Sequence, residues 1–236
     1  SYHVRPPHPR YTDPDQLLAG RDDAALYQTL LGYETYALDM ETGDLDGALT
    51  AIREAIHAFS ELSPGDRVMA LEAVIHQARG DETSAAAWLA SCGMSPADAP
   101  DFVNRFGYFL FAQVLAGQGK LEEAYRILVG LRVAVEKVGE NNLLIKILAQ
   151  EAVIAGTIGR AEEALSLLER ALNLAEPEGY IRVFINKGKK MEHLLRRAVT
   201  AGISLDFVRM LLDKCAESTA TESDKKGRSA TINEHR

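Results

Sequence analysis

Glycine, alanine and aliphatic residues recur at one fixed spacing in four segments of the chain. The segments are TGDLDGALTAI from Thr42, RGDETSAAAWL from Arg79, QGKLEEAYRIL from Gln118 and IGRAEEALSLL from Ile158. In each segment an alanine follows the glycine by five residues and an aliphatic residue follows it by nine. The glycines are Gly43, Gly80, Gly119 and Gly159, the alanines Ala48, Ala85, Ala124 and Ala164, and the aliphatic residues Ile52, Leu89, Leu128 and Leu168.

This spacing is typical of two antiparallel helices joined by a tight turn. Glycine just past a helix end adopts the left-handed conformation that turns the chain, and acidic residues favour the start of the next helix. Small alanines let two helices approach closely, and the aliphatic residue fills the space between them. Four such units, 37, 39 and 40 residues apart, predict degenerate tetratricopeptide-like (TPR-like) repeats, whose usual period is about 34 residues. The alternative, an irregular helical bundle, requires four coincidences of glycine and alanine at one offset.

The predicted fold class is all-α, a right-handed superhelix of TPR-like repeats with a C-terminal helical cap. No segment sustains the two-residue alternation of a strand. Helix pairs are expected at 22–41 with 45–60, 66–79 with 82–91, 100–117 with 121–138, and 142–157 with 161–175. The chain divides into an irregular proline-rich leader, the four repeats, the capping helices and a disordered linker, at 1–20, 21–176, 177–216 and 217–236.

The stretch LNLAEPEGYIRVFINKGKKMEHLLRRA, at 172–198, interrupts the helical pattern twice. The pattern stops at Glu-Pro-Glu-Gly, restarts at Tyr180, stops again at Gly188 and continues as a basic helix. Proline cannot continue a helix interior, so Pro177 ends the last repeat. Because a terminal repeat otherwise exposes its apolar face, we expect the following short helices to close the end of the array.

Residues 101–212 resemble the sensor region of MalT-like regulators, the large ATP-binding branch of the LuxR family, and the resemblance extends back to about residue 22. The matching features are LAEPEGYIRVF at the end of the last repeat, a short linker, an M..LLRRA helix and GIS.DFVRMLL. The resemblance implies a signalling NTPase before the sensor and a helix-turn-helix DNA-binding domain after it. It implies that this chain is the sensor alone, which binds an effector or protein partner and mediates self-association. The alternative is a free-standing adaptor that binds a peptide or protein in its concave groove.

Composition and charge restrict where such a domain works. The 236 residues carry a formal net charge of −8, which opposes binding to phosphate backbones, so we expect no direct nucleic-acid contact. No apolar run approaches the ~18–20 residues of a membrane span, and no signal peptide is visible. Cys92 and Cys215 lie far apart without a CxxC motif, which suits a reducing cytoplasm.

No motif in the sequence nominates a catalytic, metal or cofactor site. AGQGKL at 116–121 lacks the full spacing of a phosphate loop, and Leu121 stands where a metal-binding hydroxyl is needed. There is no GxSxG or HExxH motif, and the six histidines have no ligand spacing. Cys92 and Trp88 are expected to pack in the core. We therefore expect a protein that is not an enzyme and that needs no cofactor.

A binding groove is the more promising site. In this kind of repeat array the first helix of each pair lines the concave wall, and the positions 13, 10 and 6 residues before each turn glycine share one helical face. The groove candidates at these positions are Tyr33, Arg67, Phe106, Phe109, Gln113 and Lys146. Aromatic faces beside polar and charged groups suit a small polar ligand or a peptide. The alternative is that these side chains pack against neighbouring helices.

Five basic residues gather in one segment of an otherwise acidic chain: Lys187, Lys189, Lys190, Arg196 and Arg197. MalT-like proteins often have an acidic, proline-containing linker where this chain has NKGKK. Three interpretations are open. The segment is a solvated helix face, a docking surface for an acidic element of the parent protein or of a neighbouring protomer, or a direct contact with DNA.

Overall fold

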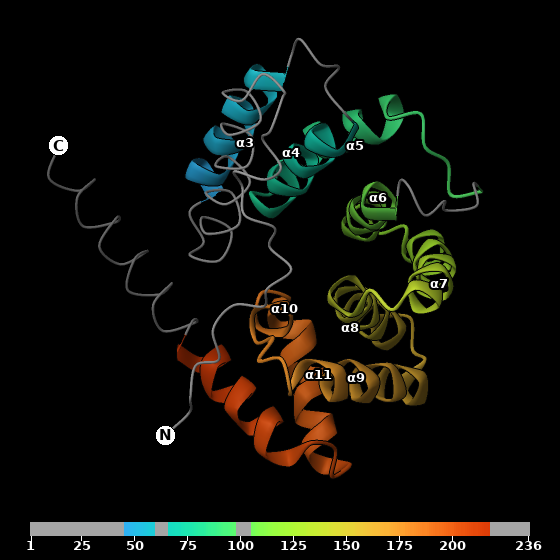
Figure 1. Cartoon of the computed structure of the whole chain (residues 1–236), viewed down its shortest axis with the longest axis vertical. Helices are drawn as coiled ribbons and strands as arrows, with labels where there is room; N and C mark the ends of the chain where they lie inside the picture. The colour runs from blue at the N-terminus through green and yellow to red at the C-terminus, as the bar shows by residue number, and fades with distance from the viewer. Residues whose placement is uncertain (1–44, 60–65, 98–104, 218–236) are drawn as a thin grey trace, which may run out of the picture. The chain divides into compact units, whose positions relative to one another are not determined.

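The computed structural model describes residues 45–59, 66–97 and 105–217 (Figure 1). Within these ranges the regular structure is helical and no strand occurs, which confirms the predicted all-α class. The expected leader, the helix at 22–41 and the tail beyond 217 lie outside the described residues. The handedness of the array and the four-part division of the chain remain predictions.

Contacts group the chain into two compact units, Ser1–Arg79 and Gly80–Arg236. In the first unit, α3 packs against α4, and Arg53 pairs with Glu72 at 2.9 Å. The bounds are α3 (Leu45–Phe59) and α4 (Asp66–Ala78) in the first unit, and α5 (Glu82–Ser91), α6 (Arg105–Gly117), α7 (Leu121–Val138), α8 (Asn141–Thr157), α9 (Ala161–Ala175), α10 (Arg182–Ile185) and α11 (Gly188–Thr200) in the second, which also has a helix over 205–217.

These bounds agree with the predicted ones to within one residue, except at the start of α6, where 98–104 is not described. The repeat glycines explain the agreement. Gly80, Gly119 and Gly159 have φ of +80°, +78° and +87°, a conformation that glycine adopts without strain. Each lies two residues before the next helix starts.

Main-chain hydrogen bonds close the turns after α6 and α8 in the same way. Lys120 N donates to Leu115 O at 3.0 Å and Gly119 N to Ala116 O at 3.2 Å. These two bonds define a Schellman motif, in which the last carbonyls of a helix are satisfied by the turn that follows. After α8, Arg160 N donates to Ala155 O at 2.8 Å, which is the same five-residue bond that Lys120 makes after α6. The turns therefore hold their shape through the backbone and one glycine.

The predicted seam alanines Ala48, Ala85, Ala124 and Ala164 are all fully buried, which confirms the repeat register. Leu128 and Leu168 are fully buried as well. The second repeat differs from the prediction, because Leu89 is only half-buried and the preceding residue, Trp88, is the buried one. The Trp88 ring meets Phe111 edge to face, with centroids 6.2 Å apart. A bulky indole thus takes the place that the aliphatic residue fills elsewhere.

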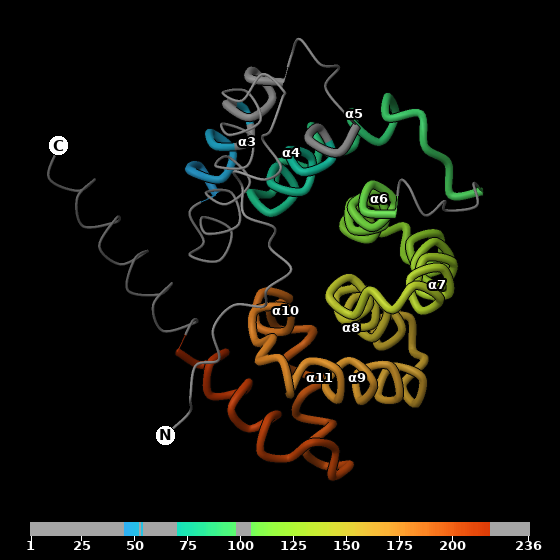
Figure 2. Tube along the Cα trace, viewed as in Figure 1, coloured from blue at the N-terminus to red at the C-terminus, as the bar shows by residue number. Residues whose placement is uncertain are grey.

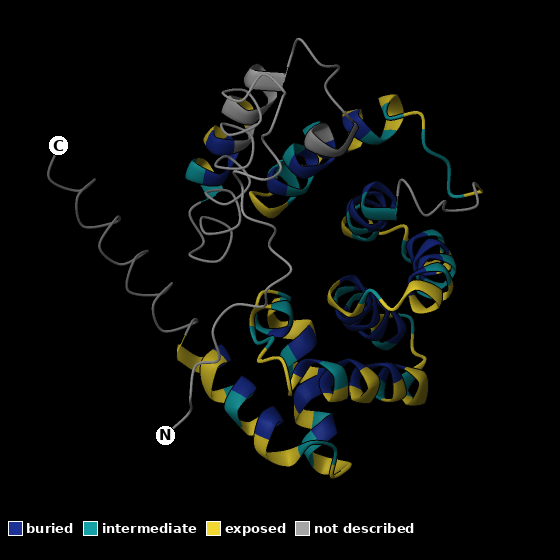
Figure 3. Cartoon of the chain, in the orientation of Figure 1, coloured by how far each residue is buried: buried dark blue, intermediate teal, exposed yellow. Residues whose placement is uncertain are grey.

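Helix α8 is the centre of the second unit. It packs against α6, α7, α9, α10 and α11, and Figure 3 shows it buried round most of its surface, whereas α9 keeps an exposed outer side. Its buried residues include Ile145, Ile147, Leu148 and Ile154. This all-round apolar character is what a helix covered by neighbours on several sides requires.

The interrupted segment after α9 forms a compact cap. Gly179 has a φ of +71°, and Tyr180 N donates to Ala175 O at 3.1 Å, so α9 ends in the same kind of turn as α6 and α8. Figure 2 shows the trace then passing through the single turn of α10 into α11. Phe184 of α10 is fully buried, and its ring meets that of Phe207 edge-on at 6.3 Å.

Helix α11 turns its apolar side to the last repeat. Met191, Leu194, Leu195 and Ala198 are buried, and α11 packs against α8 and α9. At Gly156 of α8 an added Cβ would stand 3.1 Å from Leu194 Cδ2. The glycine therefore lets α11 approach the backbone of α8 closely. Among the described helices, none is long and apolar enough to cross a membrane.

Candidate functional site

The groove candidates on α6 and α8 are placed on adjacent helices. Phe106 and Phe109 lie with ring centroids 6.4 Å apart; Phe106 is half-buried, and Phe109 is 4% exposed and belongs to the core. Gln113 and Lys146 are half-buried. Neither of the two hollows described below is lined by any of these four residues. Tyr33 and the side chain of Arg67 lie outside the described residues, so a groove running through all the predicted positions stays a prediction.

Lys187 joins the cap to α8. Its Nζ donates to Oε1 of Gln150 at 2.5 Å, and Gln150 stands one helical turn after Lys146. Burial and the charge of Lys146 lower the pKa of Lys187 to about 8. Burial also lowers the pKa of Lys146, against the pull of Glu140. Two residues proposed for different sites, Lys146 for the groove and Lys187 for docking, thus influence each other across the contact between α8 and the cap.

A hollow of about 290 Å³ opens between the last turns of α8 and the side of α11. Three of the five predicted docking residues line it, namely Lys189, Lys190 and Arg197. The remaining lining residues are Val153, Gly156 and Thr157 of α8 and His193 and Leu194 of α11. We call this feature the cationic hollow.

The lining of the cationic hollow contains no carboxylate. Within the part of the chain that the structure describes, no ion pair joins Lys189, Lys190 or Arg197 to an acidic residue. The Thr157 hydroxyl donates to the main-chain oxygen of Val153 at 2.7 Å, so its proton is already engaged. The donors available to a ligand are therefore basic side chains.

Arg196 does not share this position. Its guanidinium points to Glu192 on the same helix, with Nη2 to Oε1 at 2.6 Å, and it is not among the lining residues. The five basic residues that lie together in the sequence therefore fall into three groups in the structure. Lys189, Lys190 and Arg197 line the hollow, Lys187 is bonded to α8, and Arg196 is neutralised by its neighbour.

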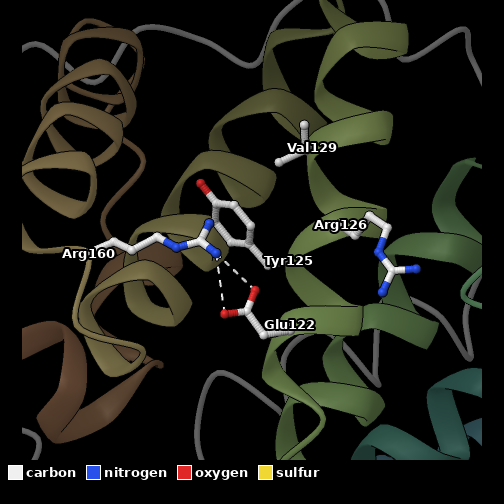
Figure 4. A pocket seen from close by; sticks show the side chains of 5 residues that line it. All are labelled: Glu122, Tyr125, Arg126, Val129 and Arg160. Carbon is white, nitrogen blue, oxygen red and sulfur yellow. Dashed lines mark hydrogen bonds and ion pairs between the residues drawn. The ribbon is translucent and has the colours of Figure 1, made fainter.

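A second hollow, of about 300 Å³, lies on α7 near the start of α9 and is lined by Glu122, Tyr125, Arg126, Val129 and Arg160. Figure 4 shows the Arg160 guanidinium against the Tyr125 ring, with its nitrogen toward Glu122 and with Arg126 extending to the other side. Arg160 lies 5.0 Å from the ring centroid and 3.0 Å from the Glu122 carboxylate. The charges of Arg160 and Glu122 therefore offset each other.

The phenol of Tyr125 adds to this arrangement by donating to Glu163 of α9 at 2.7 Å. Burial raises the pKa of Tyr125, and the hydrogen bond to Glu163 raises it further. Because Tyr125, Arg160 and Glu163 are occupied with one another, the second hollow ties α7 to α9 and leaves less charge free for a ligand than the cationic hollow does.

Sequence reasoning missed His193 and Gly156 as site residues. The spacing of the histidines alone does not identify His193, but Lys189, His193 and Arg197 follow one another at four-residue intervals and so share one face of α11. That spacing is a readable signal. Gly156 gives only a weak signal, a glycine inside a predicted helix. Among the described residues, no group of three or more His, Cys, Asp or Glu side chains could hold a metal ion.

The fold and the cap define a class of protein, a TPR-like helical-repeat domain whose last repeat is closed by short helices. The family model of the MalT-like TPR region matches residues 38–201, which is more than half of the chain. The chain therefore belongs to the MalT-like TPR family, as the sequence features predicted. The match ends at the C-terminus of α11 and so includes the cationic hollow. A comparison with curated proteins found no match.

Proposed function

We propose that this chain is the sensor domain of a transcription activator, which binds an effector or a protein partner and passes the bound state on through self-association. It works together with a signalling NTPase and a DNA-binding domain, and it performs no catalytic step itself. The observation that carries the proposal is the match of residues 38–201 to the MalT-like TPR region, because sensing is the part that this region plays in such regulators.

The geometry of the second unit supports the same function. A sensor needs a place to bind and an element that responds. The cationic hollow lies between a repeat helix, α8, and a cap helix, α11. A molecule bound there contacts both, so its binding energy depends on how the cap is held against the last repeat.

The proposal is tested in the cell that encodes the protein. The natural protein is tagged at its own locus, its positions on the chromosome are mapped by immunoprecipitation, and transcripts are compared with those of a deletion strain. We expect enrichment at promoters whose transcripts fall in the deletion strain. An even distribution along the chromosome together with unchanged transcripts would contradict the regulator and favour the adaptor alternative, which predicts a co-purifying protein or peptide instead.

Self-association is tested separately with the purified chain. Sedimentation velocity over a hundredfold range of concentration, without and with the fraction of small molecules extracted from the same cell, reports the mass of the particle. We expect the mass to rise when the extract is added. A monomer at every concentration in both conditions would remove self-association from the proposal.

A further inference from the structure

The cationic hollow concentrates positive charge more than the fold requires. Lys189, His193 and Arg197 stand on successive turns of one face of α11, and Lys190 joins them from the adjacent position. Lys189, Lys190 and Arg197 carry charges of the same sign, and these charges repel one another. The structure offsets repulsion elsewhere on the same helix, where Arg196 pairs with Glu192, but no acidic residue lines the hollow.

The position of the lysines in the helix adds to this imbalance. The first turn of α11 contains no acidic residue, whereas α7 begins with Glu122 and Glu123 and α9 with Glu162 and Glu163. The start of a helix is its positive end, which favours anions and disfavours cations. Lys189 and Lys190 thus stand where the helix itself already attracts a negative group, and the field of the backbone and the side-chain charges add at the hollow.

Size and shape limit what the hollow holds. About 290 Å³ is just below the roughly 300–1,000 Å³ of small-molecule sites, which suits a small molecule and not an extended acidic peptide. Val153, Gly156 and Leu194 give the hollow an apolar side against which a short carbon skeleton packs.

The donors point to the chemical class of the ligand. An arginine fork and lysine ammonium groups are the side chains that bind phosphate, the first in bidentate fashion and the second as point charges. A phosphate monoester places its two negative charges on one compact group, which matches three cationic side chains that line one small hollow. A dicarboxylate separates its charges along the molecule.

We propose that the cationic hollow binds the phosphate group of a small phosphorylated metabolite, with Lys189, Lys190 and Arg197 as its contacts and Val153 and Leu194 beside its carbon skeleton. This inference rests on the proposed sensor function and names the class of effector that the sensor recognises.

The test is isothermal titration calorimetry of the whole 236-residue chain at low ionic strength, with glycerol 3-phosphate as the probe. Glycerol tests the carbon skeleton, inorganic phosphate the phosphate group alone, and succinate a dicarboxylate of similar size. We expect one saturable site per chain for glycerol 3-phosphate, weaker binding of inorganic phosphate and of succinate, and no heat of binding with glycerol.

Two variants remove one cation each, Lys189→Gln and Arg197→Gln, and each should weaken glycerol 3-phosphate binding at least about tenfold, as expected for one charge-assisted hydrogen bond. The matched control is Arg196→Gln, which removes the same charge from the same helix outside the hollow, and it should change binding by less than about twofold. Circular dichroism melting curves that coincide with that of the parent show that the variants are folded.

Three outcomes would overturn the inference. They are the absence of saturable binding of glycerol 3-phosphate, an equal loss in Arg196→Gln and in the two hollow variants, and equal or tighter binding of inorganic phosphate or succinate. The sensor proposal is tested apart from this, since promoter occupancy with no phosphate binding rejects only the effector class. Phosphate binding without promoter occupancy leaves a ligand-binding domain that is not part of a regulator.

Discussion

Arg132 of α7 donates from Nε to Oε2 of Glu151 on α8 at 2.9 Å, and Glu151 is fully buried. The second carboxylate oxygen, Oε1, has no hydrogen-bond partner among the described residues. Burial raises the pKa of Glu151 to about 7, although Arg132 acts in the opposite direction. The ion pair therefore only partly offsets the cost of removing a carboxylate from water.

This relationship predicts that the contribution of Glu151 to the free energy of unfolding falls as pH rises. Between pH about 4.5 and about 7 the unfolded chain has lost the Glu151 proton while the folded chain retains it, so each step upward in pH favours unfolding. In Glu151→Gln this contribution to the slope disappears. Urea midpoints at pH 5, 6, 7 and 8 measure the slope. The exposed Glu169→Gln is the control, and an equal flattening in that variant would contradict the assignment to Glu151.

Replacing Ala124 or Ala164 by phenylalanine should lower the free energy of unfolding by roughly 1–3 kcal/mol, because both alanines are fully buried and a larger side chain overpacks the space between paired helices. Urea unfolding at constant pH measures the loss. Ala86→Phe is the matched control, since Ala86 is exposed on α5. Midpoints equal to that of the parent in both seam variants would mean that the repeat register is wrong.

Gly159→Ala should destabilise the chain by roughly 1–2 kcal/mol, the cost of holding an L-residue in the left-handed region. The cause is the backbone alone, since φ is +87° and no atom beyond the two neighbouring residues lies within 4 Å of the added Cβ. Gly119→Ala, at φ +78°, should behave in the same way. Gly117→Ala is the control, because Gly117 is the last residue of α6 and is not among the glycines with positive φ, so alanine there meets no left-handed strain. Melting temperatures that do not separate Gly159→Ala from Gly117→Ala would refute the turn assignment.

The chain by itself should not bind a DNA duplex appreciably. Only Lys189, Lys190 and Arg197 of the five basic residues line one hollow, so few phosphates are within reach, and the net charge of −8 repels the duplex. Fluorescence anisotropy of a labelled duplex at about 150 mM salt, the physiological range, measures binding. Saturable micromolar binding that is lost when Lys189, Lys190, Arg196 and Arg197 are changed to Glu would revive a direct contact with DNA.

The helices and turns could be predicted closely because their causes are local. A glycine past each helix, acidic residues at the next start and an alanine five residues on are properties of adjacent residues, and they set the bounds of α7 and α9 to the residue. Burial of Ala124 and Ala164 followed from the same spacing. The exchange of Leu89 for Trp88 could not be predicted in this way, because it depends on the distant ring of Phe111.

The cationic hollow could be predicted only in part, for a different reason. The sequence showed the basic segment but not which of its members point the same way, since that depends on where α11 lies against α8. Gly156 and Leu194 meet where α11 approaches α8, and they are 38 residues apart. Arg196 and Arg197 are adjacent in the chain, yet one pairs with Glu192 and the other lines the hollow.

The close approach of α8 and α11 at Gly156 also has a thermodynamic consequence. Because the hollow takes one wall from each helix, its affinity for any molecule is a function of the separation between the last repeat and the cap. Thermodynamic coupling is reciprocal. A partner that binds the cap and alters this separation changes the affinity of the hollow for its ligand by some factor, and the ligand changes the affinity of the cap for that partner by the same factor. Binding of a partner to the cap and binding of a ligand in the hollow are thus linked equilibria.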